Sequence, residues 1–303
     1  MLEAVIREIR KRLPDLELRE NELMSCHCSF RIGGPARAML LPKSREELLA
    51  ACALMGEMGV KPFVMGNGTN LLVTDGALEK IVIKTAGALC GVSRQGREIT
   101  AESGATLARV AVTAQQAALS GFEFAHGIPG SMGGAVSMNA GAYGGEIKDV
   151  LIQSEYLVSE GCLHTLTAPE HGLSYRRSIF TEHEDWVIVS SKILLTPGDG
   201  AEIQEKMRVL SEKRRASQPL DKPSAGSTFK RPATGYAAAL IDQAGLKGFS
   251  VGGAQVSEKH AGFVINAGGA SFDDVIRLME HIKETVLRSS GVELEPEVKI
   301  ITC

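Results

Sequence analysis

A glycine-rich stretch in the middle of the chain restricts its possible folds more than any other feature. Residues 121–146 read GFEFAHGIPGSMGGAVSMNAGAYGGE, and residues 127–134 alone hold four glycines and a proline. This density is too high for one turn, and the stretch is too apolar for a flexible linker. A backbone pressed against a large planar or phosphorylated ligand would explain it, because glycine lets the chain approach closely. A compact loop with purely structural turns is the alternative.

A second glycine loop lies upstream, where Gly66-Asn67-Gly68-Thr69-Asn70 follows the apolar run 63–65. Its successive backbone N–H groups could cradle a pyrophosphate. The loop is not a Rossmann fingerprint, because no third glycine opens a helix, and no Lys-Ser/Thr follows as in a Walker A loop. Taken alone, it is equally typical of a plain hairpin.

The remaining patterns predict a chain of alternating helices and strands. Residues 36–83 read as a small α/β unit whose helix is boxed by Ser44 and Glu47. Thr-Pro-Gly-Asp-Gly at 196–200 is the clearest linker signal. Further helices are expected at 2–13, 106–120, 201–215 and 235–244, then from Ser271 to Gly291, and a last strand at 298–301.

Charge and cysteine usage exclude several classes of protein. The 33 basic and 36 acidic residues give a net charge of −3, which argues against a dedicated nucleic-acid binder. No apolar run approaches the ~20 residues of a membrane helix, and charges interrupt the N-terminal helix, so it is not a signal peptide. Cys26-His27-Cys28 lacks the second pair of a zinc site, so no metal site is expected. Scattered cysteines indicate reduced cytosolic thiols: Cys26, Cys28, Cys52, Cys90, Cys162 and Cys303.

Three polar clusters follow the glycine stretch, at 174–178, 225–230 and 295–298. Neither Ser131 nor Ser227 lies in G-x-S-x-G, so a hydrolase nucleophile elbow is not supported. Each cluster alone is typical of surface or capping chemistry. An arginine, a serine and a glutamate could together stabilise an enolate and deliver a proton, but sequence spacing does not show whether they meet.

Taken together, these segments resemble the UDP-N-acetylenolpyruvoylglucosamine reductase (MurB) family. The matching segments keep the family's order over nearly the whole chain, and 147–174 is too short for the extra loop of one subclass, as in the shorter type II form. They are 29–36 (SFRIGGPA), 66–73, 127–145, Tyr175-Arg176, Ala225-Gly226-Ser227, 252–257 (GGAQVS) and Pro296-Glu297-Val298.

The resemblance implies an α+β fold with a vanillyl-alcohol-oxidase/PCMH-type FAD-binding part, made of two α/β subdomains, and a C-terminal α/β substrate-binding domain. We place the first subdomain at 1–86, joined by the last strand at 296–303. The second subdomain is expected at 87–200 and the substrate-binding domain at 201–295.

The resemblance also implies the reaction. NADPH would reduce bound FAD, and a hydride from flavin N5 would then reduce UDP-N-acetylglucosamine enolpyruvate to UDP-N-acetylmuramate, a peptidoglycan precursor. The expected partners are these small molecules, with no nucleic acid, membrane or metal. A cytoplasmic monomer or weak oligomer is expected.

By match to the family, Arg176 and Glu297 would stabilise the enediolate and Ser227 would protonate it, helped by the field of Lys230. Tyr143 and Lys230 are expected on the substrate side, and Arg214 and Arg215 are candidate phosphate partners from their charge. The residues expected at the FAD are Gly66, Asn67, Gly68, Thr69, Asn70, Leu71, Gly127, Pro129, Gly130, Ser131, Gly133, Gly134, Asn139 and Gly141.

Two other classes stay open at this stage. One is another flavoprotein of the same fold, such as an oxidase or the flavin subunit of a molybdenum hydroxylase, which the presence of Ser227 and Glu297 disfavours. The other is a non-catalytic flavin- or nucleotide-binding protein, which would show no substrate-dependent NADPH oxidation.

Overall fold

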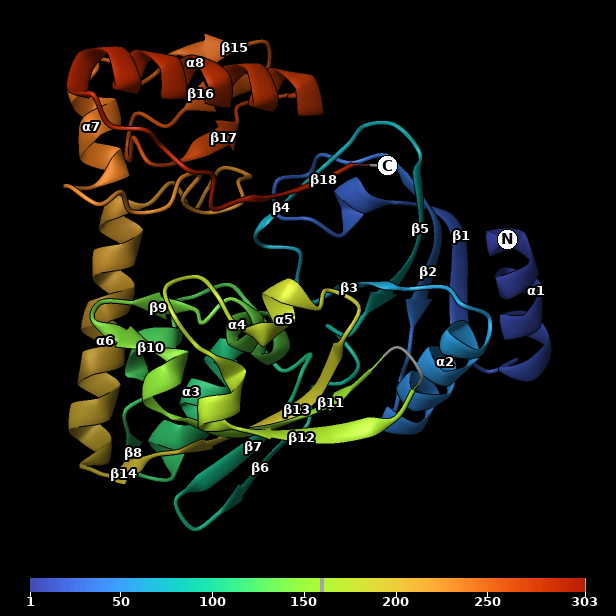
Figure 1. Ribbon diagram of the computed structural model, residues 1–303. Coiled ribbons are helices and arrows are strands. Elements are labelled where there is room, and N and C mark those ends of the chain that lie inside the picture. The colour runs from blue at the N-terminus through green and yellow to red at the C-terminus, as the bar shows by residue number, and fades with distance from the viewer. Residues whose placement is uncertain (159–160, 303) are drawn as a thin grey trace. The chain divides into compact units, whose positions relative to one another are not determined.

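The computed structural model describes residues 1–158 and 161–302 (Figure 1). The chain forms two units and passes from one unit to the other at five points, which we call crossings. Unit 1 comprises Met1–Asn21, Arg37–Asn67 and Lys80–Glu212, and unit 2 comprises Glu22–Ala36, Gly68–Glu79 and Lys213–Cys303. Four of the crossings fall inside regular elements, and the fifth falls in the glycine loop after Asn67. The three predicted domain ranges stay a prediction.

Helices α1 (Leu2–Arg12) and α2 (Arg45–Glu57) pack in unit 1 against a sheet of order β1-β2-β5-β3. The inward side chains of α1 recur at helical spacing and are almost fully buried at Val5, Ile6 and Ile9. The expected capping box of α2 is only half formed. Ser44 Oγ accepts the Glu47 N–H, but the Glu47 carboxylate accepts the N–H of Lys43. The strands are β1 (Glu17–Leu23), β2 (Pro35–Leu41), β3 (Phe63–Met65) and β5 (Leu78–Lys84).

A five-stranded antiparallel sheet of order β12-β11-β13-β7-β6 forms the other half of unit 1 (Figure 1). Short helices bury their apolar residues in the core beside this sheet. Its strands are β6 (Val92–Gln95), β7 (Glu98–Glu102), β11 (Leu151–Leu157), β12 (Leu163–Thr167) and β13 (Val187–Leu194). The helices are α3 (Leu107–Gln116), α4 (Met132–Ser137) and α5 (Ile179–Glu182), with short 3-10 turns η2 (Glu123–Ala125), η3 (Ile147–Asp149) and η4 (Ala168–His171).

Two sequence predictions are corrected around residue 118. The helix expected to reach Ser120 ends at Gln116, because Ala118 turns left-handed with φ of 51° and β8 (Leu119–Ser120) begins. Strand β8 pairs with β14 (Thr196–Pro197) in unit 1, so the segment predicted as a linker is a strand. The following helix, α6 (Gly200–Ser217), carries the chain from unit 1 to unit 2.

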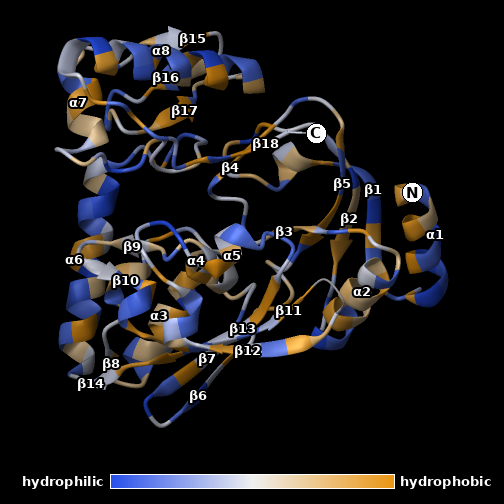
Figure 2. Ribbon diagram, viewed as in Figure 1, coloured by the Kyte–Doolittle hydropathy of each residue, from blue (hydrophilic) through white to orange (hydrophobic). Residues whose placement is uncertain are grey.

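Unit 2 packs α7 (Ala237–Gln243) and α8 (Phe272–Ser290) on the antiparallel sheet β15-β16-β17 (Figure 1). Hydrophobic and hydrophilic residues alternate along α8 with helical spacing, so one face of the helix is buried (Figure 2). Strand β18 (Lys299–Ile301) pairs in parallel with β4 (Leu71–Val73), so the end of the chain returns to an early segment. The sheet strands are β15 (Ser250–Val251), β16 (Ala254–Val256) and β17 (Val264–Asn266), and Met24–Cys26 forms η1.

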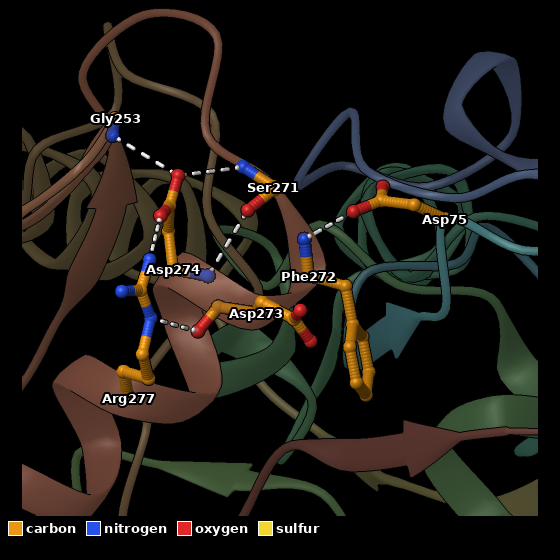
Figure 3. A network of polar contacts seen from close by, with 7 residues as sticks. All are labelled: Asp75, Gly253, Ser271, Phe272, Asp273, Asp274 and Arg277. Carbon is orange, nitrogen blue, oxygen red and sulfur yellow. Dashed lines mark hydrogen bonds and ion pairs between the residues drawn. The ribbon is translucent and has the colours of Figure 1, made fainter.

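The N-terminus of α8 holds the Gly252-Gly253 loop by one carboxylate (Figure 3). Asp274 accepts the N–H groups of Gly253 and Ser271 and pairs with Arg277, while Ser271 Oγ accepts the Asp274 N–H in a full capping box. These backbone N–H groups lower the pKa of Asp274 by stabilising its charged form. The conspicuous Gly252-Gly253 pair therefore has a structural role in docking this loop onto the helix.

No helix in the described part of the chain is both long and apolar enough to cross a membrane. Within residues 1–158 and 161–302, no group of three or more His, Cys, Asp or Glu side chains is arranged to hold a metal ion. His27 Nε2 lies 2.8 Å from a carboxylate oxygen of Glu22. Cysteines 26, 28, 52, 90 and 162 are free thiols, and Cys303 lies outside the described residues.

Candidate functional site

The glycine loop at 66–70 is not a hairpin. Strand β3 before it pairs in parallel with β5, and β4 after it pairs in parallel with β18, so the flanking strands have different partners. The loop instead carries the chain from unit 1, which ends here at Asn67, to unit 2, which resumes at Gly68. The hairpin alternative left open by the sequence is therefore excluded.

Gly66 lies directly against Ser131 of the glycine-rich stretch. A Cβ added at Gly66 would lie 2.0 Å from Ser131 Oγ, so a side chain there would force the Ser131 hydroxyl to move. Ser131 is 2 % exposed, and its hydroxyl has no hydrogen-bond partner within the described chain. The glycine loop and the glycine-rich stretch, which are separate in the sequence, thus meet in unit 1 at a buried polar atom.

Ser103 also has a buried hydroxyl without a partner in the described chain, and its Cβ and backbone pack against Gly133. The backbone here is already satisfied, because Met132 N–H donates to Ala105 O and Gly133 N–H donates to Ser103 O, both at 2.8 Å. Buried polar groups in folded proteins are almost always hydrogen-bonded. Two buried serine hydroxyls beside close-packed glycines therefore fit the polar edge of a bound ligand.

Asn139, expected at the FAD, is fully buried and its side chain makes three protein contacts. Nδ2 donates to the Glu146 carboxylate at 2.8 Å and to the Ser174 carbonyl at 2.9 Å, and Oδ1 accepts the Lys148 N–H at 2.9 Å. Both amide protons are thus used inside unit 1. The side chain joins the segment after α4 to the segment that precedes Arg176.

Tyr143 stands at the tip of a hairpin formed by β9 (Gly141–Ala142) and β10 (Gly145–Glu146). Both turn residues, Tyr143 and Gly144, have positive φ, of 54° and 88°, as a type I′ turn requires. The Tyr143 side chain is 47 % exposed. A tyrosine in this strained, exposed position contributes little to the core.

Arg176 occupies a tight turn whose ends, Ser174 and Arg177, exchange backbone hydrogen bonds. Its φ of 56° is unfavourable for any residue with a Cβ, and such strain is concentrated at functional positions. The guanidinium carbon lies 5.0 Å from the centre of the Tyr175 ring, a cation–π contact that restrains the side chain.

In unit 2, backbone pairing joins the segments that carry the other two candidate catalytic residues. Glu297 N–H donates to Thr228 O and Lys230 N–H donates to Glu295 O, both at 2.8 Å. Ser227 and Glu297 are half-buried on these neighbouring segments. Lys230, expected near Ser227, forms an ion pair with the exposed carboxylate of Glu295.

Two residues of unit 2 tie the second half of the glycine loop to these segments. Ser29 N–H donates to Gly68 O at 3.0 Å, and its Oγ donates to Ser224 O at 2.6 Å. Asn70 Nδ2 donates to Glu297 O at 3.1 Å. Ser29 belongs to a motif quoted from the sequence, but the contact spans 195 residues and nothing local signals it.

The predicted site residues are divided between the two units. In unit 1 are Gly66, Asn67, Gly127, Pro129, Gly130, Ser131, Gly133, Gly134, Asn139, Gly141, Tyr143 and Arg176. In unit 2 are Gly68, Thr69, Asn70, Leu71, Ser227, Lys230 and Glu297. Arg214 and Arg215 lie in the last turn of α6.

Comparisons with known proteins define first the class of fold. The profile of the FAD binding domain family matches residues 36–167, and that of the UDP-N-acetylenolpyruvoylglucosamine reductase C-terminal domain matches 218–301. These matches and the mixed α/β architecture confirm the expected fold class, an FAD-binding fold followed by a C-terminal domain.

Full-length relatives then define the family. A UDP-N-acetylenolpyruvoylglucosamine reductase of Caldanaerobacter subterraneus subsp. tengcongensis is 47 % identical over 301 residues, and one of Agathobacter rectalis is 48 % identical over 314; each alignment covers 99 % of both chains. The crystal structure of the MurB enzyme of Thermus caldophilus superposes with a TM-score of 0.80 at 32 % identity, covering 95 % of this chain and 99 % of that one. The chain belongs to the UDP-N-acetylenolpyruvoylglucosamine reductase family. It is therefore an oxidoreductase with FAD as its cofactor.

Proposed function

We propose that the chain catalyses the NADPH-driven reduction of UDP-N-acetylglucosamine enolpyruvate to UDP-N-acetylmuramate, a precursor of peptidoglycan. The observation that carries this proposal is the full-length similarity to reductases of that name, at 47 % identity with 99 % coverage of both chains. The buried hydroxyls of Ser103 and Ser131 support a bound cofactor in unit 1, because they have no hydrogen-bond partner within the described chain.

Bound FAD would take up a hydride from NADPH and supply it to the vinyl CH₂ of the substrate. Addition there leaves negative charge on the carbon next to the carboxylate, and this charge spreads into an enediolate. A fixed cation lowers the free energy of such a charge more than a mobile one, because no reorganisation is needed. The strained turn and the Tyr175 contact support this role for Arg176.

Glu297 and Ser227 would supply the other two roles in the reaction. Glu297 would hydrogen-bond the enediolate, and Ser227 would donate the proton that forms the C–H bond. Serine is a weak acid, but a carbanion is a strong base, so the transfer is favourable once the hydroxyl is in place. Tyr143 is proposed to contact the sugar nucleotide, for which its exposed position at a hairpin tip is suited.

The proposed FAD contacts of 66–71 and 127–141, the ranges of the three predicted domains, a cytoplasmic location and a monomeric or weakly oligomeric state accompany this function as predictions. The location follows from the proposed substrates, since NADPH and nucleotide sugars are intracellular metabolites.

Two measurements on the purified protein test the function. Flavin absorption near 450 nm, about the usual flavin band, should accompany the protein, or appear when FAD is added. NADPH oxidation should then depend on the enolpyruvyl sugar nucleotide. Protein that takes up no FAD, or that oxidises NADPH at the same rate without this substrate, would contradict the proposal.

A further inference from the structure

The side chain of Asn70 is directed to the backbone of Glu297. Its Nδ2 donates to the Glu297 carbonyl oxygen at 3.1 Å. The backbone carbonyl of Asn70 accepts the N–H of Lys299 at 2.9 Å. The next residue, Leu71, is paired with Lys299 at the start of the parallel β4–β18 ladder. Asn70 therefore meets the end of the chain through both its side chain and its backbone.

The peptide of Glu297 is fixed on both sides by these contacts. Its N–H donates to Thr228 O at 2.8 Å, and its carbonyl accepts from Asn70. Thr228 follows Ser227 directly and is itself anchored, because its Oγ1 accepts the Val264 N–H at 2.9 Å. The backbone of Glu297 thus lies between the glycine loop and the segment that carries Ser227.

Ser29 adds a second connection from the same loop. Through its N–H to Gly68 and its Oγ to Ser224, it links the glycine loop to the segment three residues before Ser227. The glycine loop is therefore hydrogen-bonded directly to Glu297 and, through Ser29, to the segment that carries Ser227. Each bond lies within unit 2, so this network belongs to one unit.

We infer that Asn70 is a positioning residue, whose side chain holds Glu297 in place, and that this side chain is not a ligand of FAD. The inference rests on the proposed function for the role of Glu297, but not for the contact itself. An amide suits this task because it donates to a carbonyl, whereas the isosteric carboxylate of aspartate would place oxygen against oxygen. This leaves the proposed cofactor contacts of the loop to its backbone N–H groups.

Amide hydrogen exchange tests the contact without reference to catalysis. The variant Asn70→Ala, purified with FAD, should exchange the amides of Glu297–Ile301 about fivefold faster, the effect expected for loss of one hydrogen bond. Asn70→Asp should exchange at least as fast. Glu79→Ala, at an exposed position of unit 2 outside this network, should leave exchange at 297–301 unchanged. Equal exchange in wild type and both Asn70 variants would overturn the inference.

Half-reaction kinetics separate positioning from cofactor binding. Asn70→Ala should retain its FAD dissociation constant and its rate of flavin reduction by NADPH within about twofold. Reoxidation by the enolpyruvyl substrate should slow by about tenfold, because only this step uses Glu297. Weaker FAD binding with normal reoxidation would make Asn70 a cofactor ligand and overturn the inference. If wild-type enzyme shows no substrate-dependent reoxidation, the proposed function fails, and the exchange experiment still decides the role of Asn70.

Discussion

The side-chain amide of Asn139 donates a hydrogen bond to the carbonyl of Ser174, at 2.9 Å, two residues before Arg176. This contact connects the end of the glycine-rich stretch to the strained turn that displays the proposed catalytic cation. Asn139 itself is left-handed, with φ of 44°, and its partner Ser174 starts the turn that contains the left-handed Arg176. Two strained positions are thus held by one buried amide.

Replacing Asn139 by alanine should weaken both the fold and catalysis. It removes three hydrogen bonds, leaves the Lys148 N–H without its partner and leaves the Ser174 carbonyl with only the Arg177 N–H, which costs about 2–3 kcal/mol in the free energy of unfolding. Substrate-dependent turnover should fall by about tenfold or more, because Arg176 loses its fixed position. Denaturant unfolding and steady-state kinetics check these values.

Lys148→Ala is the matched control for this variant. Asn139 accepts the backbone N–H of Lys148, which the substitution keeps, and the Lys148 side chain only pairs with Glu146 at the surface. The control should unfold within about 1 kcal/mol of wild type. An Asn139→Ala protein as stable and as active as this control would refute the assigned role.

Gly66 and Ser131 should behave as a coupled pair. Alanine at position 66 would bring a Cβ to 2.0 Å from Ser131 Oγ and should destabilise the protein by about 1–3 kcal/mol. The double variant Gly66→Ala/Ser131→Ala removes the clashing oxygen and should recover much of this loss. Thermal unfolding of the four proteins of the cycle measures the coupling. Gly200→Ala, whose Cβ would have no neighbour closer than 3.8 Å, provides the control, and additive effects at 66 and 131 would contradict the packing argument.

Ser227→Ala should separate the two half-reactions. Reduction of the flavin by NADPH needs no proton from Ser227 and should stay within about twofold of wild type, whereas reoxidation by substrate should slow by about 100-fold or more. Stopped-flow absorbance of the flavin follows each step. Ser224→Ala, on the same loop, keeps the carbonyl that Ser29 uses and should change neither rate by more than about twofold. Reoxidation that is equally fast in both variants would exclude Ser227 as the donor.

Glu123 should make the stability of unit 1 sensitive to acid. Its carboxylate is 3 % exposed and accepts from Ser120 Oγ at 2.7 Å and Gly121 N–H at 3.0 Å, with Lys206 Nζ at 3.4 Å. Burial raises the pKa of Glu123, but these hydrogen bonds and the Lys206 charge outweigh burial and lower it overall. The folded protein therefore holds this proton less tightly than the unfolded chain. The stabilisation is present above the unfolded pKa, about 4.3, and is lost as pH falls through the lower folded pKa.

Glu123→Gln tests that pH dependence. The variant should be less stable than wild type by about 1–3 kcal/mol at neutral pH, because the neutral amide replaces a charged acceptor. The difference should shrink as the pH falls from about 5 towards 3. Urea unfolding at several pH values provides the comparison. A difference that stays constant over this range would show that Glu123 does not titrate with folding.

Local sequence signals predicted the elements that depend on near neighbours. The helix from Ser271 to Gly291 is observed as Phe272–Ser290, with its capping box and its left-handed glycine in place. The elements expected over 36–83 are also observed, but residues 68–79 belong to unit 2, so the range is not one unit, and Glu47 bonds to Lys43 instead of closing its box. The prediction of a helix as far as Ser120 was wrong because β8 pairs with β14, whose partner residues lie 76 and 78 positions further along the chain. Propensity within one segment carries no information about such a partner.

The sequence by itself determined the family and the residue types of the site, because glycine spacing and the ordered motifs are properties of the linear chain. Only the tertiary structure decided what these residues contact. In the folded chain, Gly66 lies against Ser131, and the Asn139 side chain donates a hydrogen bond to the Ser174 carbonyl. The Asn70 side chain donates to the carbonyl of Glu297, which is 227 residues away in the sequence. The physical reason is that a hydrogen bond or a steric contact depends on distance in space, and the pairing of β4 with β18 sets that distance for Asn70.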